Sequence, residues 1–314
     1  MKKILITGGA GFVGSHLAEK LMEDPSNFVV IVDNLSTGKK ENLPKKSKEN
    51  WLFIKADVNE YRDISEIMFG HKFDYVFHYA ALVGVIRTQA HPVKVLRDIE
   101  GIKHILNIAK STGVKRVFFS SSSEVYGEPV ELPQHELTTP LNSRVPYAVV
   151  KNVGEAFLRS YQYEFGLEYT IFRFFNTYGQ RQSKDFVMSK FIYAALHNKD
   201  ISIYGDGSQT RTFCFVDDNV GACVKAFYEN KVINDVINIG GETEITMLEL
   251  AKLIIELTGS SSKIVHIDKL KEGDMTRRCP DNSKMKALLN RDMLPLREGI
   301  RKLLESNHFA PLTH

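Results

Sequence analysis

The sequence predicts an α/β protein with a doubly wound parallel sheet and a second, smaller, mixed α/β domain. Three observations predict this fold class. Short apolar segments alternate with helical periodicity through the first half of the 314 residues, a glycine-rich turn follows the first segment, and the regular alternation ends near residue 175. Strands that alternate with helices form parallel sheets covered on both faces.

Six strands are expected in the first half, each a short run rich in β-branched or aromatic residues. They fall at residues 4–6, 28–32, 51–54, 75–77, 117–119 and 169–172. Helical spacing of apolar residues begins at Phe12 and recurs at residues 93–109 and 147–165.

The second half is less regular. Residues 201–204 read as a short strand before a glycine turn, and Thr246 with Glu249 forms a capping box that opens an apolar helix. We therefore expect one domain at residues 1–175, joined by a returning segment near 235–258, and another at 176–314.

Charge and composition exclude several classes of protein. Lysine plus arginine minus aspartate plus glutamate is 41 − 38 = +3, too balanced for a nucleic-acid-binding protein. The sequence has no run of 18 apolar residues, so no association with a membrane is expected. The three cysteines, Cys214, Cys223 and Cys279, form no CxxC pair, which argues against disulfides and a metal site and favours the cytoplasm.

The glycine-rich turn is the strongest local motif. Gly8, Gly11 and Gly14 follow the first strand and open the first helix, where free N–H groups and the helix dipole favour a pyrophosphate. Asp33 ends the second strand, 19 residues beyond Gly14, where an acid can bind the adenosine ribose. This arrangement predicts a Rossmann dinucleotide site. The charge of Asp33 favours NAD over NADP, because it would repel a 2′-phosphate.

A second constellation carries acid–base chemistry. Tyr147 and Lys151 stand four residues apart, on one face of a predicted helix, where the ammonium can lower the pKa of the phenol. The serines at residues 120–123 follow the fifth strand, at the carboxyl edge of the sheet where ligands of such folds bind.

Together these motifs resemble the extended short-chain dehydrogenase/reductases, in their nucleotide-sugar epimerase/dehydratase branch. The resemblance covers nearly the whole chain and includes TGGAGFVGSHL, DNLSTG, SSSSEVYG, YAVVK and RFFNTYG. It implies that Ser122, Glu124, Tyr147 and Lys151 are catalytic. It implies cofactor contacts from Gly8, Gly11, Phe12, Val13, Gly14, Asp33, Asn34, Ser36, Thr37, Gly38, Asp57, Val58, Tyr79, Ala80, Ala81, Ser120, Tyr147, Lys151 and Phe174.

The resemblance also implies a nucleotide-diphosphate sugar as substrate, most often a UDP-sugar. The substrate contacts would come from Arg87, Ser123, Asn176, Tyr204, Arg211 and Arg278. Arginine suits a diphosphate because its guanidinium donates two parallel hydrogen bonds to phosphate oxygens. A homodimer is implied too, built on the helices at 93–109 and 147–165. Their apolar residues Val95, Ile99, Ile102, Leu106, Phe157 and Tyr161 exceed one core-facing stripe.

The reaction within the family stays open. The 4,6-dehydratases of this branch carry Asp-Glu where this sequence has Ser123 and Glu124, so the acid for dehydration is lacking. Uronic-acid decarboxylases have Ser-Glu there and an arginine three residues before the tyrosine, as Arg144 stands here. The segment from Leu82 to Arg87 instead looks like an epimerase loop.

We therefore expect an NAD-dependent nucleotide-sugar epimerase that acts through a 4-keto sugar, at C4 or, with Glu124 as carbon base, at C5. A UDP-uronic acid decarboxylase is the first alternative, and a 4-ketoreductase or 4,6-dehydratase the next. An NAD-sensing protein without catalysis is the alternative of another class, although such proteins typically lose the Tyr/Lys pair.

Overall fold

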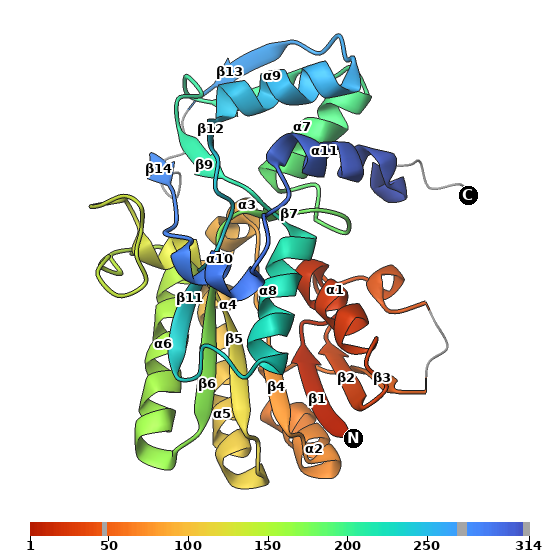
Figure 1. Cartoon of the computed structure of the whole chain (residues 1–314), viewed down its shortest axis with the longest axis vertical. Coiled ribbons are helices and arrows are strands. Elements are labelled where there is room, and N and C mark those ends of the chain that lie inside the picture. Colours follow the sequence, from red (N-terminus) through yellow and green to blue (C-terminus); the bar gives the residue numbers. More distant parts are fainter. Residues whose placement is uncertain (46–48, 269–274, 310–314) are drawn as a thin grey trace.

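A parallel sheet organises the computed structural model, which describes residues 1–45, 49–268 and 275–309 (Figure 1). Within them, seven strands lie in the order β11-β6-β5-β4-β1-β2-β3, all parallel. Their bounds are β1 Lys2–Thr7, β2 Asn27–Asp33, β3 Trp51–Lys55, β4 Tyr75–His78, β5 Arg116–Ser122, β6 Glu168–Phe174 and β11 Asp235–Ile239. The strand order reverses between β1 and β4, which is where such sheets bind ligands.

Alternate strand residues pack on opposite faces, as the period of a β-strand requires. Ile6, Ile31 and Phe118 face the layer of α1 (Phe12–Leu21) and α8 (Val216–Tyr228). Leu5 and Phe119 face α2 (Tyr61–His71), α5 (Asp98–Thr112) and α6 (Pro146–Phe165). Both faces are therefore buried, which explains the continuous apolar runs in the sequence.

The helix expected at residues 93–109 is divided into two helices, α4 (Pro92–Leu96) and α5, with Arg97 as the junction. The short helix α3 (Val85–Ala90) precedes them. The helix expected at 147–165 is α6, which begins one residue earlier because proline is well suited to the first helical position.

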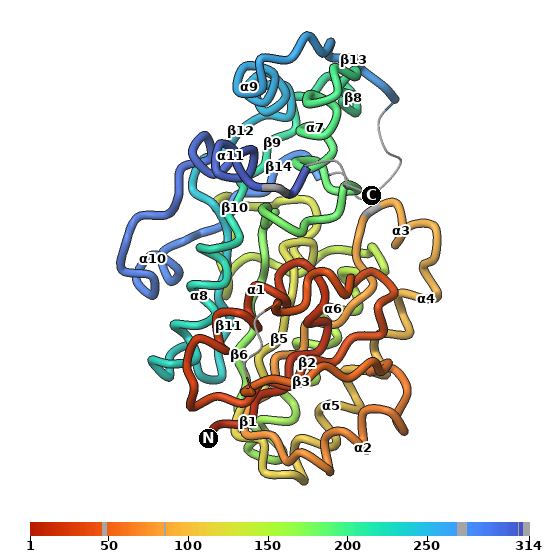
Figure 2. Tube along the Cα trace, turned by 90° about the vertical axis from the view of Figure 1, so that its right-hand side faces the viewer, coloured from red at the N-terminus to blue at the C-terminus, as the bar shows by residue number. Residues whose placement is uncertain are grey.

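The smaller part of the molecule is built mainly after residue 175 and lies beyond the carboxyl ends of the strands (Figures 1 and 2). Its elements are β7 Thr177–Tyr178, α7 Val187–Leu196, β8 Ile201–Tyr204, β9 Thr210–Thr212, β10 Cys214–Phe215, β12 Glu244–Thr246, α9 Met247–Thr258, β13 Ile264–Ile267, β14 Arg277–Arg278, α10 Ser283–Leu289 and α11 Leu296–Glu305. Short 3₁₀ turns stand at η1 Lys40–Asn42, η2 Ser123–Tyr126 and η3 Asn307–Phe309.

Two segments beyond residue 175 join the large sheet, since α8 packs on α1 and β11 pairs with β6. By contrast, α9 packs on α7 and begins with the capping box expected at Thr246 and Glu249. Among the described residues, no helix combines the length and apolar character that a membrane span needs.

The apolar surplus expected on α4, α5 and α6 is smaller than the sequence suggests. Val95, Ile102 and Leu106 are at most 3% exposed and belong to the chain's own core. This part of the dimer argument was wrong, because α5 and α6 pack against each other as well as on the sheet. Phe157 and Tyr161 are only partly buried.

Candidate active site

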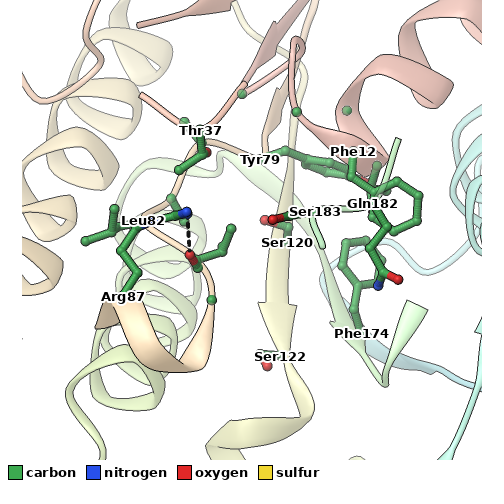
Figure 3. Close-up of a pocket in the computed structure, with 18 of the residues that line it drawn as sticks. Phe12, Thr37, Tyr79, Leu82, Arg87, Ser120, Ser122, Phe174, Gln182 and Ser183 are labelled. Atoms are coloured by element: carbon green, nitrogen blue, oxygen red, sulfur yellow. Dashed lines mark hydrogen bonds between the residues drawn. The ribbon is translucent and has the colours of Figure 1, made fainter. Parts of the chain in front are cut away.

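A large cavity opens at the carboxyl ends of β1, β2, β4, β5 and β6, between the sheet and the smaller part (Figure 3). Its volume is about 1070 Å³, and it is long enough to touch both the glycine turn and Arg278. Nearly every residue singled out from the sequence lines it: Gly8, Gly11, Phe12, Val13, Gly14, Asp33, Asn34, Ser36, Thr37, Asp57, Val58, Tyr79, Ala80, Ala81, Arg87, Ser120, Ser122, Ser123, Glu124, Tyr147, Lys151, Phe174, Asn176 and Arg278.

Three predicted residues do not form this wall among the described residues. Gly38 instead packs against Asp33, where an added Cβ would lie 2.7 Å from both carboxylate oxygens. Arg211 lies on β9 beside Arg278 of β14, in register, and donates to the Thr210 carbonyl at 2.7 Å. Tyr204, at the end of β8, has Lys190 over its ring. The cofactor contact of Gly38 and the substrate contacts of Tyr204 and Arg211 stay predictions.

The glycine turn is shaped as a cradle. Gly8 has φ +70°, and an added Cβ would lie 2.6 Å from the backbone nitrogen of Ala80. At Gly14 a Cβ would lie 2.4 Å from the carbonyl oxygen of Gly8. Side chains are thus excluded where the backbone must approach a pyrophosphate, and α1 begins at this point with Gly11 as its N-cap.

Asp33 stands at the end of β2, 7% exposed, and lines the cavity. Its carboxylate accepts the backbone N–H groups of Ala10 at 3.0 Å and Leu35 at 2.7 Å. Burial raises its pKa, against the lowering effect of these two hydrogen bonds. Each oxygen keeps a free lone pair, so the carboxylate fits the hydroxyl groups of an adenosine ribose. The cradle and the acid together fit NAD.

The phenol of Tyr147 lies in a buried position on the first turn of α6. Burial raises its pKa, and the charge of Glu124 raises it further, whereas a hydrogen bond with Ser122 and the charge of Arg278 lower it. The lowering of this pKa by Lys151 stays a prediction. Lys151 Nζ lies over the Tyr147 ring, 5.7 Å from its centroid, and donates to Ser120 Oγ at 3.5 Å.

Lys151 is 3% exposed, and burial lowers its pKa from 10.5 to about 8. The charge of Asp98 opposes this shift. Asp98 also lines the cavity and accepts the N–H of Leu82 at 2.7 Å. The sequence analysis missed Asp98 because it placed the residue inside one long helix. Its position in the first turn of α5, where acids are favoured, was the available signal.

Glu124 and Arg278 meet at the far end of the cavity. Arg278 Nη1 lies 3.7 Å from Glu124 Oε1, and both side chains are mostly buried. Arg278 Nε is buried without a hydrogen-bond partner. A buried guanidinium with an unused donor suits an anionic ligand group. Arg144, by contrast, is exposed.

Other cavity residues hold the wall in place rather than offering free groups. Arg87 pairs with Asp185 at 3.1 Å, and the amide of Asn176 donates to the carbonyl of Thr212 at 2.9 Å. Gln182 was not expected from the sequence. Figure 3 shows it in the cavity with Phe12, Tyr79 and Phe174.

His78 is buried at the end of β4. It is 3% exposed, its Nδ1 lies 2.8 Å from Thr7 Oγ1, and burial together with the charge of Lys151 lowers its pKa to about 3. The ring is neutral at physiological pH and ties the ends of β1 and β4 together.

Known proteins resemble this chain in sequence and in fold. A family model, described as the NAD dependent epimerase/dehydratase family, matches residues 4–240. UDP-glucuronic acid decarboxylase 3 of Arabidopsis thaliana is 38% identical over 312 residues, covering 95% of this chain and 86% of the relative.

Two solved structures of epimerases resemble this fold. UDP-glucose 4-epimerase of Thermotoga maritima, solved with UDP-glucose, has a TM-score of 0.89 at 34% identity and covers 96% of this chain and 97% of its own. UDP-glucose 4-epimerase of Thermus thermophilus, complexed with NAD, has a TM-score of 0.89 at 28% identity, with 98% of both chains covered. These matches confirm the predicted fold class, NAD cofactor and enzyme class, a nucleotide-sugar epimerase or decarboxylase. The chain belongs to the NAD-dependent epimerase/dehydratase family.

Proposed function

We propose that the protein is a UDP-sugar epimerase that oxidises C4 of the sugar and inverts a carbon centre through the resulting ketone. The observation that carries this proposal is the meeting of Tyr147, Ser122 and Lys151 in one cavity with the NAD cradle. Relatives that act on UDP-sugars support the choice of nucleotide.

Bound NAD supplies the acceptor for the hydride that leaves C4. Tyr147 takes the proton of the C4 hydroxyl, and Ser122, which hydrogen-bonds Tyr147, shares that proton. Lys151 places a buried positive charge beside the phenol, which favours the phenolate as it forms. Arg278 pairs with the diphosphate, and Asn176 orients the adjoining turn.

Decarboxylation of a UDP-uronic acid is the second candidate, and the pairing of Glu124 with Arg278 favours it. A ketone at C4 makes the bond from C5 to the substrate's carboxylate breakable: CO₂ leaves, and C5 takes up a proton from solvent that Glu124 relays while Arg278 keeps its charge. The carboxylate of Glu124, acting as a base, would serve inversion at C5.

One experiment separates these reactions. The holoenzyme is incubated in D₂O with UDP-glucose, UDP-N-acetylglucosamine or UDP-glucuronic acid, and products are identified by NMR. Inversion at C4 without deuterium uptake supports the epimerase. Release of CO₂ with a UDP-pentose supports the decarboxylase. Deuterium at C5 of a product that keeps all six sugar carbons, abolished by Glu124→Gln, supports the C5 route. Turnover of none of these sugars contradicts the proposal.

A homodimer through α5 and α6 is part of the proposal. Phe157 and Tyr161 are partly exposed, and Phe165, at the end of α6, is 50% exposed. Light scattering that finds a monomer at micromolar concentration contradicts it. A cytoplasmic location is proposed as well, because Cys214 and Cys223 are buried free thiols, which a reducing compartment preserves.

A further inference from the structure

A buried ion pair joins α6 to the sheet directly beneath the cavity. Arg173 of β6 donates from Nε to Glu155 Oε1 at 2.9 Å and from Nη2 to Glu155 Oε2 at 2.7 Å. The side chains are 1% and 0% exposed. Ser121 of β5 donates to the same carboxylate at 2.7 Å, so Glu155 is held from two strands at once.

The pair continues into the turn that holds Glu124. Arg173 Nη1 donates to the hydroxyl of Tyr126 at 2.8 Å, and that hydroxyl donates to Asn238 of β11 at 2.7 Å. We call Ser121, Tyr126, Glu155, Arg173 and Asn238 the Glu155 network. It ties together α6, three strands of the sheet and the 3₁₀ turn η2.

Ser121 itself lines the cavity, and three other members of the network lie next to a residue of its wall. Glu155 follows Lys151 by one helical turn, and Lys151 follows Tyr147 by another, so the three share one face of α6. The other neighbouring pairs are Ser121 with Ser122, Arg173 with Phe174, and Tyr126 with Glu124, two residues before it.

A buried ion pair is a poor means of stabilising a fold, because desolvation of two charges offsets their attraction. It does fix geometry, because a bidentate pair holds its partners in one orientation. We propose that Glu155 and Arg173 are positioning residues for the reaction: they set the register of α6 against β5, and thereby hold the hydroxyl of Tyr147 at Ser122. The proposal rests on the assignment of Tyr147 as the base.

Loss of this register has a defined consequence. The hydrogen bond from Ser122 lowers the pKa of Tyr147, against burial. If α6 shifts away from β5, that hydrogen bond weakens and the pKa rises. The phenolate then forms only at higher pH, and the rate at neutral pH falls.

The chain offers a matched control at the amino-terminal ends of the strands, away from the cavity. Arg116 is also a buried arginine, 1% exposed, and its Nε lies 3.4 Å from Glu168 Oε2 of the neighbouring strand. It stands at the start of β5, five residues before Ser121, about 16 Å along the strand. Arg116→Lys therefore perturbs a buried arginine of the same sheet without touching the cavity.

The test is a titration of Tyr147 in the holoenzyme that needs no substrate. Phenolate absorbance is recorded against pH for each protein and for the same protein carrying Tyr147→Phe, and the difference reports Tyr147 alone. We expect Arg173→Lys and the milder Ser121→Ala to move the midpoint to higher pH, and Arg116→Lys to leave it unchanged. In turnover of a UDP-sugar, kcat should fall by up to about 10²-fold in Arg173→Lys, with KM and bound NAD within about threefold.

An unmoved midpoint in both Arg173→Lys and Ser121→Ala overturns the proposal, as does an equal shift in Arg116→Lys. If Arg173→Lys fails to fold, Ser121→Ala decides, because it removes one hydrogen bond and little volume. Failure of the proposed function is distinguished by a different result: Tyr147→Phe would then turn over the UDP-sugar normally, whatever the titration shows.

Discussion

Gly8→Ala tests the reason why a glycine stands at the first position of the cofactor turn. Gly8 has φ +70°, a conformation that costs an L-residue about 1–2 kcal/mol. An added Cβ would also lie 2.6 Å from the nitrogen and 2.8 Å from the Cα of Ala80. Both are backbone atoms of the loop that follows β4, so neither can rotate away.

The two costs can be separated with other glycines of this chain. Gly166 caps α6 with φ +71°, and nothing lies within 4 Å of a Cβ added there. Gly70 lies on the exposed face of α2, with no positive φ and open space around it. Gly166→Ala therefore carries the backbone cost alone, and Gly70→Ala carries neither cost.

The expected changes in the free energy of unfolding follow from these environments. Gly70→Ala should stabilise the protein by roughly 0.5–1 kcal/mol, since glycine inside a helix is unfavourable. Gly166→Ala should destabilise it by about 1 kcal/mol, because the strain is partly offset by a less flexible unfolded chain. Gly8→Ala adds an overpacking cost of about 1–3 kcal/mol.

Urea unfolding of the NAD-free proteins measures these differences, and bound NAD after purification gives a second readout. Gly8→Ala should lose NAD, because the clash separates two loops that line the cavity, whereas Gly166→Ala and Gly70→Ala should retain it. The reasoning is refuted if Gly8→Ala is no less stable than Gly166→Ala and binds NAD as the wild type does.

Three further predictions concern the charged and phenolic groups. Tyr147→Phe should lower kcat by about 10²–10⁴-fold while NAD stays bound, and activity within tenfold of wild type would contradict the base assignment. The protein should purify with NAD(H), because Asp33 would repel a 2′-phosphate, and predominant NADP(H) in the denatured supernatant would refute this. Lys151→Met should stabilise the NAD-free fold most below about pH 8. Between about pH 8 and 10.5 this advantage should shrink, because the unfolded chain then binds a proton at Lys151 that the folded chain does not, and a constant difference would show that the pKa is not lowered.

Much of the large sheet follows from the sequence because its strands are buried on both faces. Each of the six expected strands exists, extended by one to four residues, since apolar runs define the buried centre of a strand but not its ends. The break between α4 and α5 was not predictable from periodicity. Arg97 has helical dihedral angles, φ −62° and ψ −24°, so the apolar spacing continues through a junction where the helix ends.

The limits at the substrate end have a different cause. Arg211 and Arg278 are far apart in sequence, and only the pairing of β9 with β14 places them side by side. Composition identifies both as anion-binding candidates. Composition does not predict that Arg278 reaches the cavity while Arg211 donates to its own strand. The difference depends on the pairing register between two segments that lie 67 residues apart.

The serines of β5 show where local rules would have been enough. Side chains of a strand alternate between faces, and Phe119 packs on the α6 face whereas Phe118 packs on the other. Ser121 must then face α6, and it does, donating to Glu155. The one fact missing from the sequence was which face α6 covers. Once this is known, the alternation predicts that Ser121 anchors the helix. It does not predict the meeting of Ser122 with Tyr147, which depends on where the end of β5 and the first turn of α6 reach the cavity.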